Sequence, residues 1–397
     1  MKLSKDELLS RASNLQLRIV GESTFVTLDG ETVSGGKHIL KILDIFSKPI
    51  SLDDALPSLS SSGIQDWIDL TAEIHYLYEH GILVSENASG RTYKPGRGFG
   101  ALPVHVMMIN DQARTHAFLS AIREAVRPGD VVVEIGTGTG LLSIEAAKAG
   151  AKHVYAIEAT GIGEIAYEMF QVNGVADRVT LMTGWSTQVT LPEKADVLIS
   201  EIIGNDIFEE NVLESFSDAV MRHLKPHTRM IPSQIDVLAQ LLYIPEDALK
   251  TYSPVPSQCA DWQRAYGIDF SPLMAASQSQ YLYIRLKAHQ ARDWTLIGSP
   301  LCLAAINLIT NTDLTLEASA EATAQDAHVV NAVMIYPDLK LTDNIHLARH
   351  IPEATEEDNW ASAFYLLPKP IEFKAGEKYR VYYRTSHPRP EVRVERV

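Results

Sequence analysis

The chain has 397 residues, of which 35 are Lys or Arg and 50 are Asp or Glu, giving a formal net charge of −15 at pH 7. At this length two or three domains are expected. The composition, 46% hydrophobic and 21% charged, is that of an ordinary soluble globular protein. The negative charge argues against a protein that binds nucleic acid through its phosphates and favours a cationic partner.

The two cysteines, Cys259 and Cys302, lie far apart and form no CxxC pair. They predict neither a disulfide framework nor a zinc site, and we expect no metal centre. The N-terminus has no apolar segment of the signal-peptide type, and no apolar run approaches the roughly 18 residues of a membrane helix. We therefore expect a cytoplasmic protein with no membrane contact.

Residues 1–88 are predicted to form a small winged-helix-like α+β domain, followed by a glycine-rich linker at 89–103. Asp29-Gly30 is a hairpin turn signal. The predicted elements are strands at Leu17–Val26 and Ile82–Val84 and helices at His38–Phe46 and Ile64–His80.

Residues 104–232 alternate strands with helices, which predicts a doubly wound, Rossmann-like parallel sheet with helices on both faces. A single helix over Val104–Val126 is expected to precede it. The predicted strands are Val131–Ile135, His153–Ile157, Val179–Met182 and Val197–Ser200, and the predicted helices are Leu141–Ala149, Gly161–Asn173 and Val212–His223.

Residues 233–397 lose the helices between strands and are predicted to form an antiparallel β domain, interrupted by an insertion at about 246–280. The predicted strands are Gln234–Tyr243, Tyr281–Lys287, Cys302–Ile309, His328–Tyr336, Ala363–Leu367 and Arg380–Ser386.

A glycine cluster, Gly136, Gly138 and Gly140, follows the first strand of the predicted sheet. Glycine lets the backbone approach a ligand, and the following helix offers unpaired N–H groups. Glu158 ends the second strand, where a carboxylate can accept hydrogen bonds from ribose hydroxyls. We expect a nucleoside-type cofactor here; a tight turn without a ligand is the alternative.

The spacing of the glycines distinguishes between cofactors. Gly140 falls one residue earlier than the G-x-G-x-x-G of dinucleotide folds requires, and Leu141 takes the expected place. Glu134, two residues before Gly136, completes a pattern that resembles the E/D-x-G-x-G-x-G of class I methyltransferases. We therefore expect S-adenosyl-L-methionine, with S-adenosyl-L-homocysteine as product, rather than NAD.

Four carboxylates lie between Glu201 and Glu210, just after the fourth strand. A solvated acidic loop that caps the next helix is one interpretation. With Ser200 and Gly204, however, the segment resembles the S-E-x-x-G-x-x-x-x-x-E loop of protein arginine N-methyltransferases. The resemblance implies that Glu201 and Glu210 are catalytic and hold a substrate guanidinium, which pairs well with carboxylates.

The resemblance extends to Val104–Thr115, which is similar to the family's I-H-x-x-M-L-x-D-x-x-R-T helix. It implies that His105 lies against the cofactor, that Met108 lines the acceptor channel and that Arg114 binds the cofactor carboxylate. Taken alone, Met108 would be read as a core residue and Arg114 as an exposed helix arginine. The remaining cofactor-binding positions that it implies are Glu134, Gly136, Gly138, Gly140, Glu158, Trp185, Ser186 and Thr187.

Two later segments also resemble this family, whose C-terminal domain is a β-barrel. Asp261–Phe270 is similar to the dimerisation arm, which implies a homodimer, and Asn359-Trp360 is similar to the start of the barrel segment T-H-W. Asn359 replaces the histidine, so its pairing with Asp111 cannot be ionic. Ile202, Ile203 and Asn205 replace bulkier residues, which leaves the acceptor and the number of methyl groups open.

The front domain resembles PqqD-like leader-peptide recognition domains, which bind a peptide as an added strand. The resemblance implies methylation of arginine in a ribosomally made precursor peptide. A winged-helix DNA binder, which its acidic residues disfavour, and a purely structural appendage are alternatives. For the whole chain, the alternatives are a methyltransferase of a non-arginine acceptor, with the carboxylates as general base, and a non-catalytic binding protein of the same fold.

Overall fold

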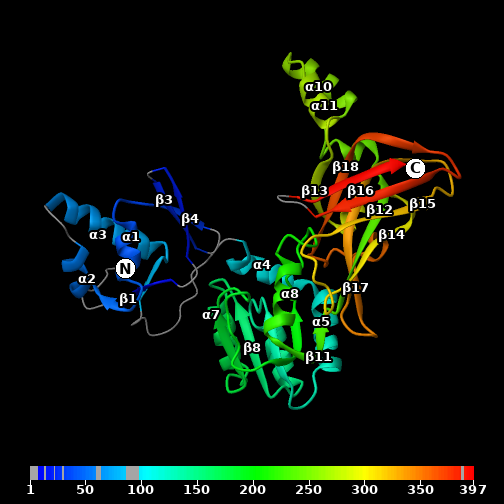
Figure 1. Ribbon diagram of the computed structural model, residues 1–397. Helices are drawn as coiled ribbons and strands as arrows, with labels where there is room; N and C mark the ends of the chain where they lie inside the picture. Colours follow the sequence, from blue (N-terminus) through cyan, green and yellow to red (C-terminus); the bar gives the residue numbers. More distant parts are fainter. Residues whose placement is uncertain are drawn as a thin grey trace. The chain divides into compact units, whose positions relative to one another are not determined.

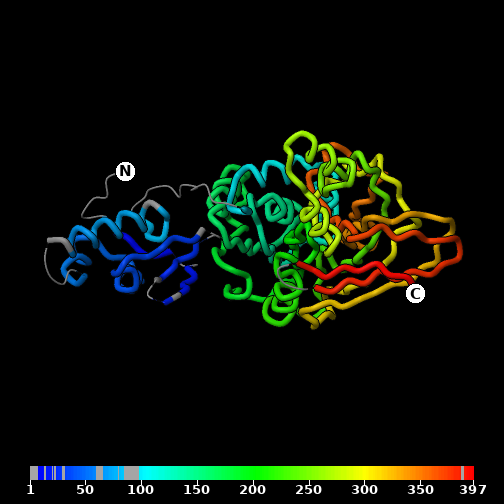
Figure 2. The backbone as a smooth tube through the Cα atoms, turned by 90° about the horizontal axis from the view of Figure 1, so that it is seen from above, coloured from blue at the N-terminus to red at the C-terminus, as the bar shows by residue number. Residues whose placement is uncertain are grey.

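The computed structural model describes residues 8–12, 15–21, 23–28, 31–59, 64–85, 98–385 and 389–397. The chain divides into two compact units, of which the first comprises residues 1–105, 136–144 and 155–189 and the second residues 106–135, 145–154 and 190–397. Figures 1 and 2 trace the course of the chain.

The described segments between residues 8 and 85 form two small antiparallel sheets and three helices. One sheet has the strand order β5-β1-β6 and the other the order β2-β3-β4. The elements are β1 (Leu8–Arg11), β2 (Gln16–Val20), β3 (Ser23–Leu28), β4 (Glu31–Gly35), α1 (Ile39–Ile45), β5 (Ile50–Ser51), α2 (Leu52–Leu59), α3 (Ile64–Glu79) and β6 (Leu83–Ser85).

The prediction of one strand over Leu17–Val26 is wrong, because this segment is a hairpin of β2 and β3. Gly21 adopts a φ of 61°, a left-handed conformation that glycine takes without strain, and the chain turns there. The turn predicted at Asp29-Gly30 lies outside the described residues. Both predicted helices form, and Ile42 and Leu77 lie in a core that includes residues of β1 and β6.

The middle of the chain forms a five-stranded sheet of order β11-β10-β7-β8-β9, in which β10 pairs in parallel with both β7 and β11. Its elements are β7 (Val131–Ile135), α6 (Leu141–Lys148), β8 (His153–Glu158), α7 (Gly163–Val172), β9 (Val179–Thr183), β10 (Ala195–Ser200), α8 (Val212–Arg222) and β11 (Leu224–Ile231). Every residue of β7 is buried, as expected of a central parallel strand rich in valine. The Rossmann-like sheet is therefore confirmed, while β11 was not predicted.

The strand order of this sheet reverses between β7 and β10, which are its first and fourth strands in sequence order. In doubly wound sheets ligands bind at the carboxyl ends of the strands beside such a reversal. Ile135 and Ser200, the last residues of these two strands, are partners, and the Ser200 Oγ donates to the Ile135 carbonyl at 3.0 Å. The chain therefore leaves both strands at the same edge of the sheet, toward Gly136 and toward Glu201.

The single helix expected over Val104–Val126 is wrong, because the structure has two helices, α4 (Leu102–Asn110) and α5 (Gln112–Ala125), after the short 3₁₀ turn η1 (Gly98–Gly100). Asp111 interrupts them with φ −73° and ψ 83°. Its Oδ1 accepts the backbone N–H of Arg114 at 3.1 Å and caps α5.

The remainder forms an antiparallel β domain, as predicted. One sheet has the order β13-β18-β16-β12-β14, with β17 beside β16, and the other has the order β15-β19-β20. Figure 2 shows the long strands near the C-terminus running side by side. The strands and 3₁₀ turns are β12 (Gln234–Tyr243), β13 (Leu282–Lys287), η2 (Ala288–Ala291), β14 (Thr295–Asn307), β15 (Glu317–Thr323), β16 (His328–Lys340), β17 (His346–Ala348), η3 (Ile351–Glu353), β18 (Ala361–Phe373), β19 (Lys378–Arg384) and β20 (Glu391–Arg396).

The insertion predicted at about 246–280 is helical and comprises α9 (Glu246–Leu249), α10 (Pro256–Tyr266) and α11 (Ser271–Ser277). Figure 1 shows α10 and α11 projecting from the β domain as an arm. The rings of Trp262 and Tyr266 pack edge-on against Phe270, with centroids 5.3 and 6.3 Å away. Tyr266, Ile268 and Leu273 are nevertheless exposed, which leaves an apolar surface on the arm.

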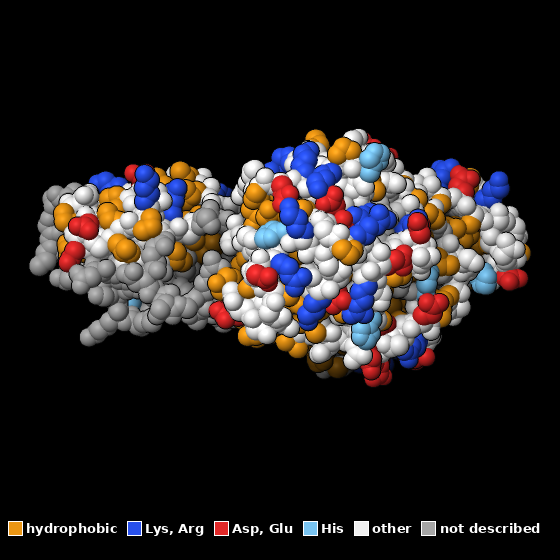
Figure 3. Space-filling view, turned by 90° about the horizontal axis from the view of Figure 1, so that it is seen from below, with side chains coloured by type: hydrophobic (Ala, Val, Ile, Leu, Met, Phe, Trp, Pro, Cys, Tyr) orange, Lys and Arg blue, Asp and Glu red, His pale blue; other side chains and the backbone are white. Residues whose placement is uncertain are grey.

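Charged side chains on the β domain are largely paired across strands. In the sheet β15-β19-β20, Arg380 pairs with Glu321 and Glu395, so positive and negative groups alternate. On the face seen in Figure 3, acidic and basic side chains are interspersed. Among the described residues no cluster of His, Cys, Asp and Glu could hold a metal ion, and none of their helices is long and apolar enough to span a membrane.

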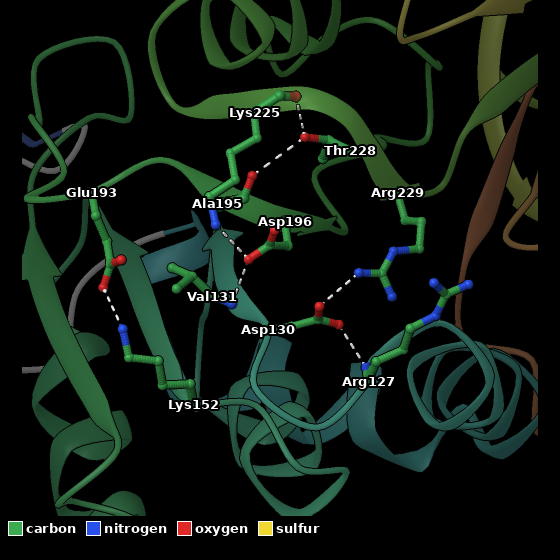
Figure 4. Close-up of polar contacts among 10 residues, drawn as sticks. All are labelled: Arg127, Asp130, Val131, Lys152, Glu193, Ala195, Asp196, Lys225, Thr228 and Arg229. Atoms are coloured by element: carbon green, nitrogen blue, oxygen red, sulfur yellow. Dashed lines mark hydrogen bonds and ion pairs between the residues drawn. The ribbon is translucent and has the colours of Figure 1, made fainter.

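Ionic contacts tie the amino ends of the parallel strands together (Figure 4). Asp130 accepts the N–H of Arg127 at 2.6 Å and pairs with Arg229 at 2.7 Å. Asp196 accepts the N–H of Val131 at 2.9 Å and pairs with Lys225. Partial burial acts to raise the pKa of the Asp196 carboxyl, but Lys225 and the Val131 N–H together lower it below its ordinary value. These contacts lie at the opposite end of the strands from Ile135 and Ser200, so their role is structural.

We predict that Arg229→Met destabilises the protein by about 1–3 kcal/mol, because it leaves the mostly buried Asp130 carboxylate without its cation. Lys152→Met is the matched control. Lys152 pairs with Glu193 at 3.6 Å and both side chains are exposed, so the change should stay within about 0.5 kcal/mol. Urea unfolding of the two variants checks this, and equal effects would contradict it.

Candidate functional site

The glycine loop, residues 136–140, depends on glycine for its shape. Gly136, Gly138 and Gly140 have φ values of 77°, 55° and 85°, which other residues adopt only with strain. A Cβ on Gly140 would also lie 2.5 Å from the Phe170 ring. The loop is thus held close to its neighbours, and its glycines satisfy a backbone requirement whether or not a ligand is bound.

Glu158, at the end of β8, connects the glycine loop to the residues after the strand. Its Oε2 accepts the Gly138 N–H at 2.8 Å, and its Oε1 accepts the Thr160 N–H and hydroxyl at 2.9 and 2.8 Å. Although the residue is only 7% exposed, its carboxylate has lone pairs beyond these three bonds. The acid at the end of the second strand therefore lies beside the glycine loop, and its binding to a ribose stays a prediction.

His105 lies over the same loop. Its ring would be 3.0 Å from a Cβ on Gly138, so the ring lies directly over that glycine. The His105 Nε2 is 2.7 Å from the Phe99 carbonyl, which fixes the ring's orientation. The structure therefore brings together His105, the glycine loop and Glu158, which the sequence assigned to one cofactor.

The other predicted cofactor positions differ in burial. Glu134 is 1% exposed within β7, and Ser186 is also buried. Trp185, just after β9, is 47% exposed, and Thr187 is exposed as well. The exposed Trp185 ring offers an apolar face to a ligand.

The four carboxylates of the glutamate loop, residues 201–210, have different interaction partners. Glu201 pairs with Arg114, and Asp206 accepts the Tyr365 hydroxyl at 3.2 Å. Glu209 pairs with Arg285 at 2.5 Å and also accepts the Asn205 N–H at 3.0 Å. For Glu210 the described residues provide no ion pair. The acidic-loop interpretation therefore fits Glu209, which shapes the loop, but not Glu201 and Glu210, which are half-buried.

Two details explain the residues of this loop. A Cβ on Gly204 would lie 2.4 Å from the Glu209 Cγ, so only glycine fits there. Asp206 is 4% exposed, and burial raises its pKa to about 6 although the Tyr365 hydroxyl stabilises the charged form. Asn211, with a left-handed φ of 54°, then turns the chain into α8.

Glu201 and Arg114 form a nearly buried ion pair, with 3.0 Å between Oε2 and Nη2 and with side chains 11% and 14% exposed. Burial raises the pKa of Glu201, while Arg114 and the more distant Arg349 lower it. The pair brings the predicted cofactor arginine and the predicted catalytic glutamate together.

Glu210 has the least compensated charge of the site. Burial, together with the negative charges of Glu201 and Glu209, raises its pKa to about 8, against a smaller opposing effect of Arg114. A buried carboxylate close to another carboxylate is costly unless a cation joins them. The two glutamates therefore present a place where a cation gains more than it would in water.

Three consecutive residues of the β domain hold the glutamate loop and the start of α5. The Asn359 N–H donates to the Asp111 Oδ2 at 2.9 Å, the Trp360 Nε1 to the Ile203 carbonyl at 3.1 Å, and the Ala361 N–H to the Asn205 Oδ1 at 3.1 Å. The contact between Asn359 and Asp111 uses a backbone donor, in agreement with the expectation that it cannot be ionic.

The sequence did not identify every residue of this site. Met108 lies where expected on α4, half-buried, with its carbonyl accepting the Thr115 hydroxyl at 3.4 Å. Arg285 and Arg349 were missed, because each is an isolated arginine in a β segment and its role appears only once distant strands are assembled.

Comparison with known proteins agrees with this geometry. The family model of ribosomal protein L11 methyltransferase (PrmA) matches residues 111–241. Over 173 residues the chain is 39% identical to the probable protein arginine N-methyltransferase 6 of Arabidopsis thaliana, a match over 43% of this chain and 38% of that protein. It is 27% identical to protein arginine N-methyltransferase 1 of Schizosaccharomyces pombe over 70% of this chain and 80% of that one.

Among solved structures, the chain resembles the Trypanosoma brucei PRMT1 enzyme–prozyme heterotetrameric complex with AdoHcy. The TM-score is 0.64 at 22% identity, over 75% of this chain and 94% of that chain. The chain therefore shares the fold of an arginine methyltransferase: a Rossmann-like sheet followed by an antiparallel β domain. The match to the Arabidopsis relative is shorter, and the chain spans little more than a third of that protein's length.

We predict that Glu210→Gln stabilises the protein in alkaline solution. The pKa of Glu210 is raised from 4.5 to about 8 in the folded state, so ionisation opposes folding. The cost is absent below pH 4.5 and complete above about 8, so the variant should melt at least about 2 °C higher than the wild type at pH 8.5 and equally at pH 4.5. Glu214→Gln, exposed in the first turn of α8, should change neither value. A lower melting temperature for Glu210→Gln at pH 8.5 would show that its charge is compensated.

Proposed function

We propose that this chain is an S-adenosylmethionine-dependent arginine N-methyltransferase that acts on a peptide or protein. The observation that carries the proposal is the half-buried pair of glutamates, of which Glu201 is partly neutralised by Arg114 and Glu210 has no cationic partner among the described residues. A guanidinium would supply the missing charge and, as a planar fork of donors, can bind two carboxylates at once.

The other half of the proposal is the cofactor. Glu158 and the glycine loop fit a nucleoside: the carboxylate is buried with lone pairs to spare, and glycines with positive φ allow close approach. Glu158 would hold the ribose, and His105, over Gly138, would cover the cofactor. The names of the relatives and the AdoHcy of the Trypanosoma complex support the same cofactor. When bound, S-adenosylmethionine supplies an activated methyl group on sulfur.

The residues of the chain would orient the acceptor and take up the proton. Glu201 and Glu210 would hold the guanidinium so that one terminal nitrogen faces the methyl group, a gain in proximity and alignment. That nitrogen would form a bond to the methyl carbon while the bond between this carbon and sulfur breaks, with S-adenosyl-L-homocysteine as the leaving group. The nitrogen would also lose a proton, so the methylated guanidinium keeps its single positive charge. Glu210, whose pKa is raised to about 8, is suited to accept the proton near neutral pH.

We predict that Glu201→Gln and Glu210→Gln each lower kcat for methylation of an arginine peptide by about 10²-fold or more, while both variants still bind S-adenosylmethionine. Glu214→Gln should behave as the wild type. Mass spectrometry with fragmentation would place the added mass on arginine. Methylation of another residue would favour a different acceptor, and tight cofactor binding without any turnover by the wild type would favour a binding protein.

We further propose that the arm of α10 and α11 joins two copies of the chain. Tyr266, Ile268 and Leu273 are 65%, 57% and 48% exposed, which is unusual for three large apolar side chains close together in sequence. The arm projects from the β domain, as a segment that contacts a second copy would (Figure 1). We propose a homodimer on this basis.

For the front domain we propose peptide recognition at the outer edge of β2. In the described part of the chain β2 pairs only with β3, so its other side can accept an added strand. Leu17 and Ile19 on this strand are 48% and 63% exposed and would contact alternate side chains of a peptide. A ribosomally made precursor with an arginine beyond its leader is the substrate that this arrangement would serve.

We predict that the double variant Leu17→Lys with Ile19→Lys raises the KM for a leader-bearing peptide about tenfold and leaves kcat unchanged, since both positions lie outside the core. A short arginine peptide without a leader should show no difference. Leu40→Lys, at an equally exposed position on α1, is the control. Unchanged KM values for the leader-bearing peptide would leave the front domain without a role in recognition.

A further inference from the structure

Arg349, just after β17, is a buried arginine that the proposed reaction does not use. It is 9% exposed, and its Nη1 donates to the Ala361 carbonyl at 2.9 Å. Its Nη2 is buried and has no hydrogen-bond partner among the described residues. A buried guanidinium with an unpaired nitrogen is costly, so other interactions must offset that cost.

The first such interaction is with Trp360. The Arg349 guanidinium stacks on the indole ring at 3.1 Å from its centroid, and the Arg114 guanidinium lies 5.5 Å from the same centroid. The Trp360 Nε1 donates to the Ile203 carbonyl in the glutamate loop. Arg349 therefore fixes a ring that is itself bonded to the loop carrying Glu201.

The second interaction is electrostatic. Burial lowers the pKa of Arg349 well below its usual range and the charge of Arg114 lowers it further, while Asp111, Glu201 and Asp358 act in the opposite direction and favour the charged guanidinium. Glu201 is in turn influenced by Arg114 and Arg349, which favour its ionised form, and by Asp111, which opposes it. Asp111, Glu201, Arg114 and Arg349 therefore influence one another's charge, and Arg349 is the second cation of this group.

We propose that Arg349 is a positioning residue for the acceptor site, which orients Trp360 against the glutamate loop and supplies the second positive charge beside Glu201. The inference rests on the proposed arginine methylation. Arg349 touches neither the acceptor nor the cofactor in this role, because it acts through Trp360 and through its charge.

The test is the pH dependence of kcat/KM for an arginine peptide. In Arg349→Met the acid limb should move up by about one pH unit, since Glu201 then ionises beside one cation instead of two. Arg349→Lys keeps the charge and should leave the limb in place. Arg292→Met is the control, because Arg292 binds the Ala354 carbonyl nearby but is not among the charges that act on Glu201. A limb that stays in place in Arg349→Met, or that moves equally in Arg349→Lys, would overturn the proposal.

A second measurement needs no substrate and separates this inference from the proposed function. If Arg349 acts on Glu201, then Arg349→Met should lower the melting temperature less in a Glu201→Gln background than in the wild type at pH 8. Equal losses in both backgrounds would overturn the role of Arg349 whether or not the wild type methylates arginine. If the coupling is found and the wild type methylates no arginine, the proposed function fails and the charge relationship stands.

Discussion

The half-buried, like-charged pair Glu201 and Glu210 is the constraint on which the rest of the site depends. Two carboxylates within mutual influence, with the pKa of one raised to about 8, destabilise the fold unless their surroundings compensate. Arg114 pairs with Glu201 directly, and Arg349 adds a second cation behind Trp360. The compensation is incomplete, and this incompleteness favours a cationic ligand.

The β domain also holds the glutamate loop in place. Residues 359–361 form hydrogen bonds to the side chain that caps α5, to the Ile203 carbonyl and to the Asn205 side chain. On the far side of the loop, Glu209 is held by Arg285 of β13. The glutamate loop is therefore fixed by residues that follow it by some 75 to 160 positions in the chain, which gives one physical reason why the sheet and the β domain occur together.

The parts of the fold and of the site that depend on residues close together in the chain could be predicted from the sequence. The valine-rich β7, the glycine loop and the spacing of Glu201 and Glu210 each depend on neighbours in the chain. Long-range effects could not be predicted. The helix break at Asp111 depends on a side-chain cap that also binds Asn359, the hairpin at Gly21 interrupts an apparently continuous alternation, and Arg349 has no motif around it. The strands β11, β15 and β20 were missed because their alternation is weak or carries charged residues paired across strands.

The number of protons released when the acceptor binds is the most direct test of whether a guanidinium binds between Glu201 and Glu210. Calorimetric titration of an arginine peptide into the protein at pH 7, in buffers of different ionisation enthalpy, measures the protons exchanged. Glu210, with its pKa raised to about 8, should be mostly protonated before the peptide binds and ionised afterwards. We therefore expect Glu210 to release close to one proton on binding. That release should disappear in Glu210→Gln. Binding without proton release, or release that persists in the variant, would contradict the claim that the guanidinium binds between these two carboxylates.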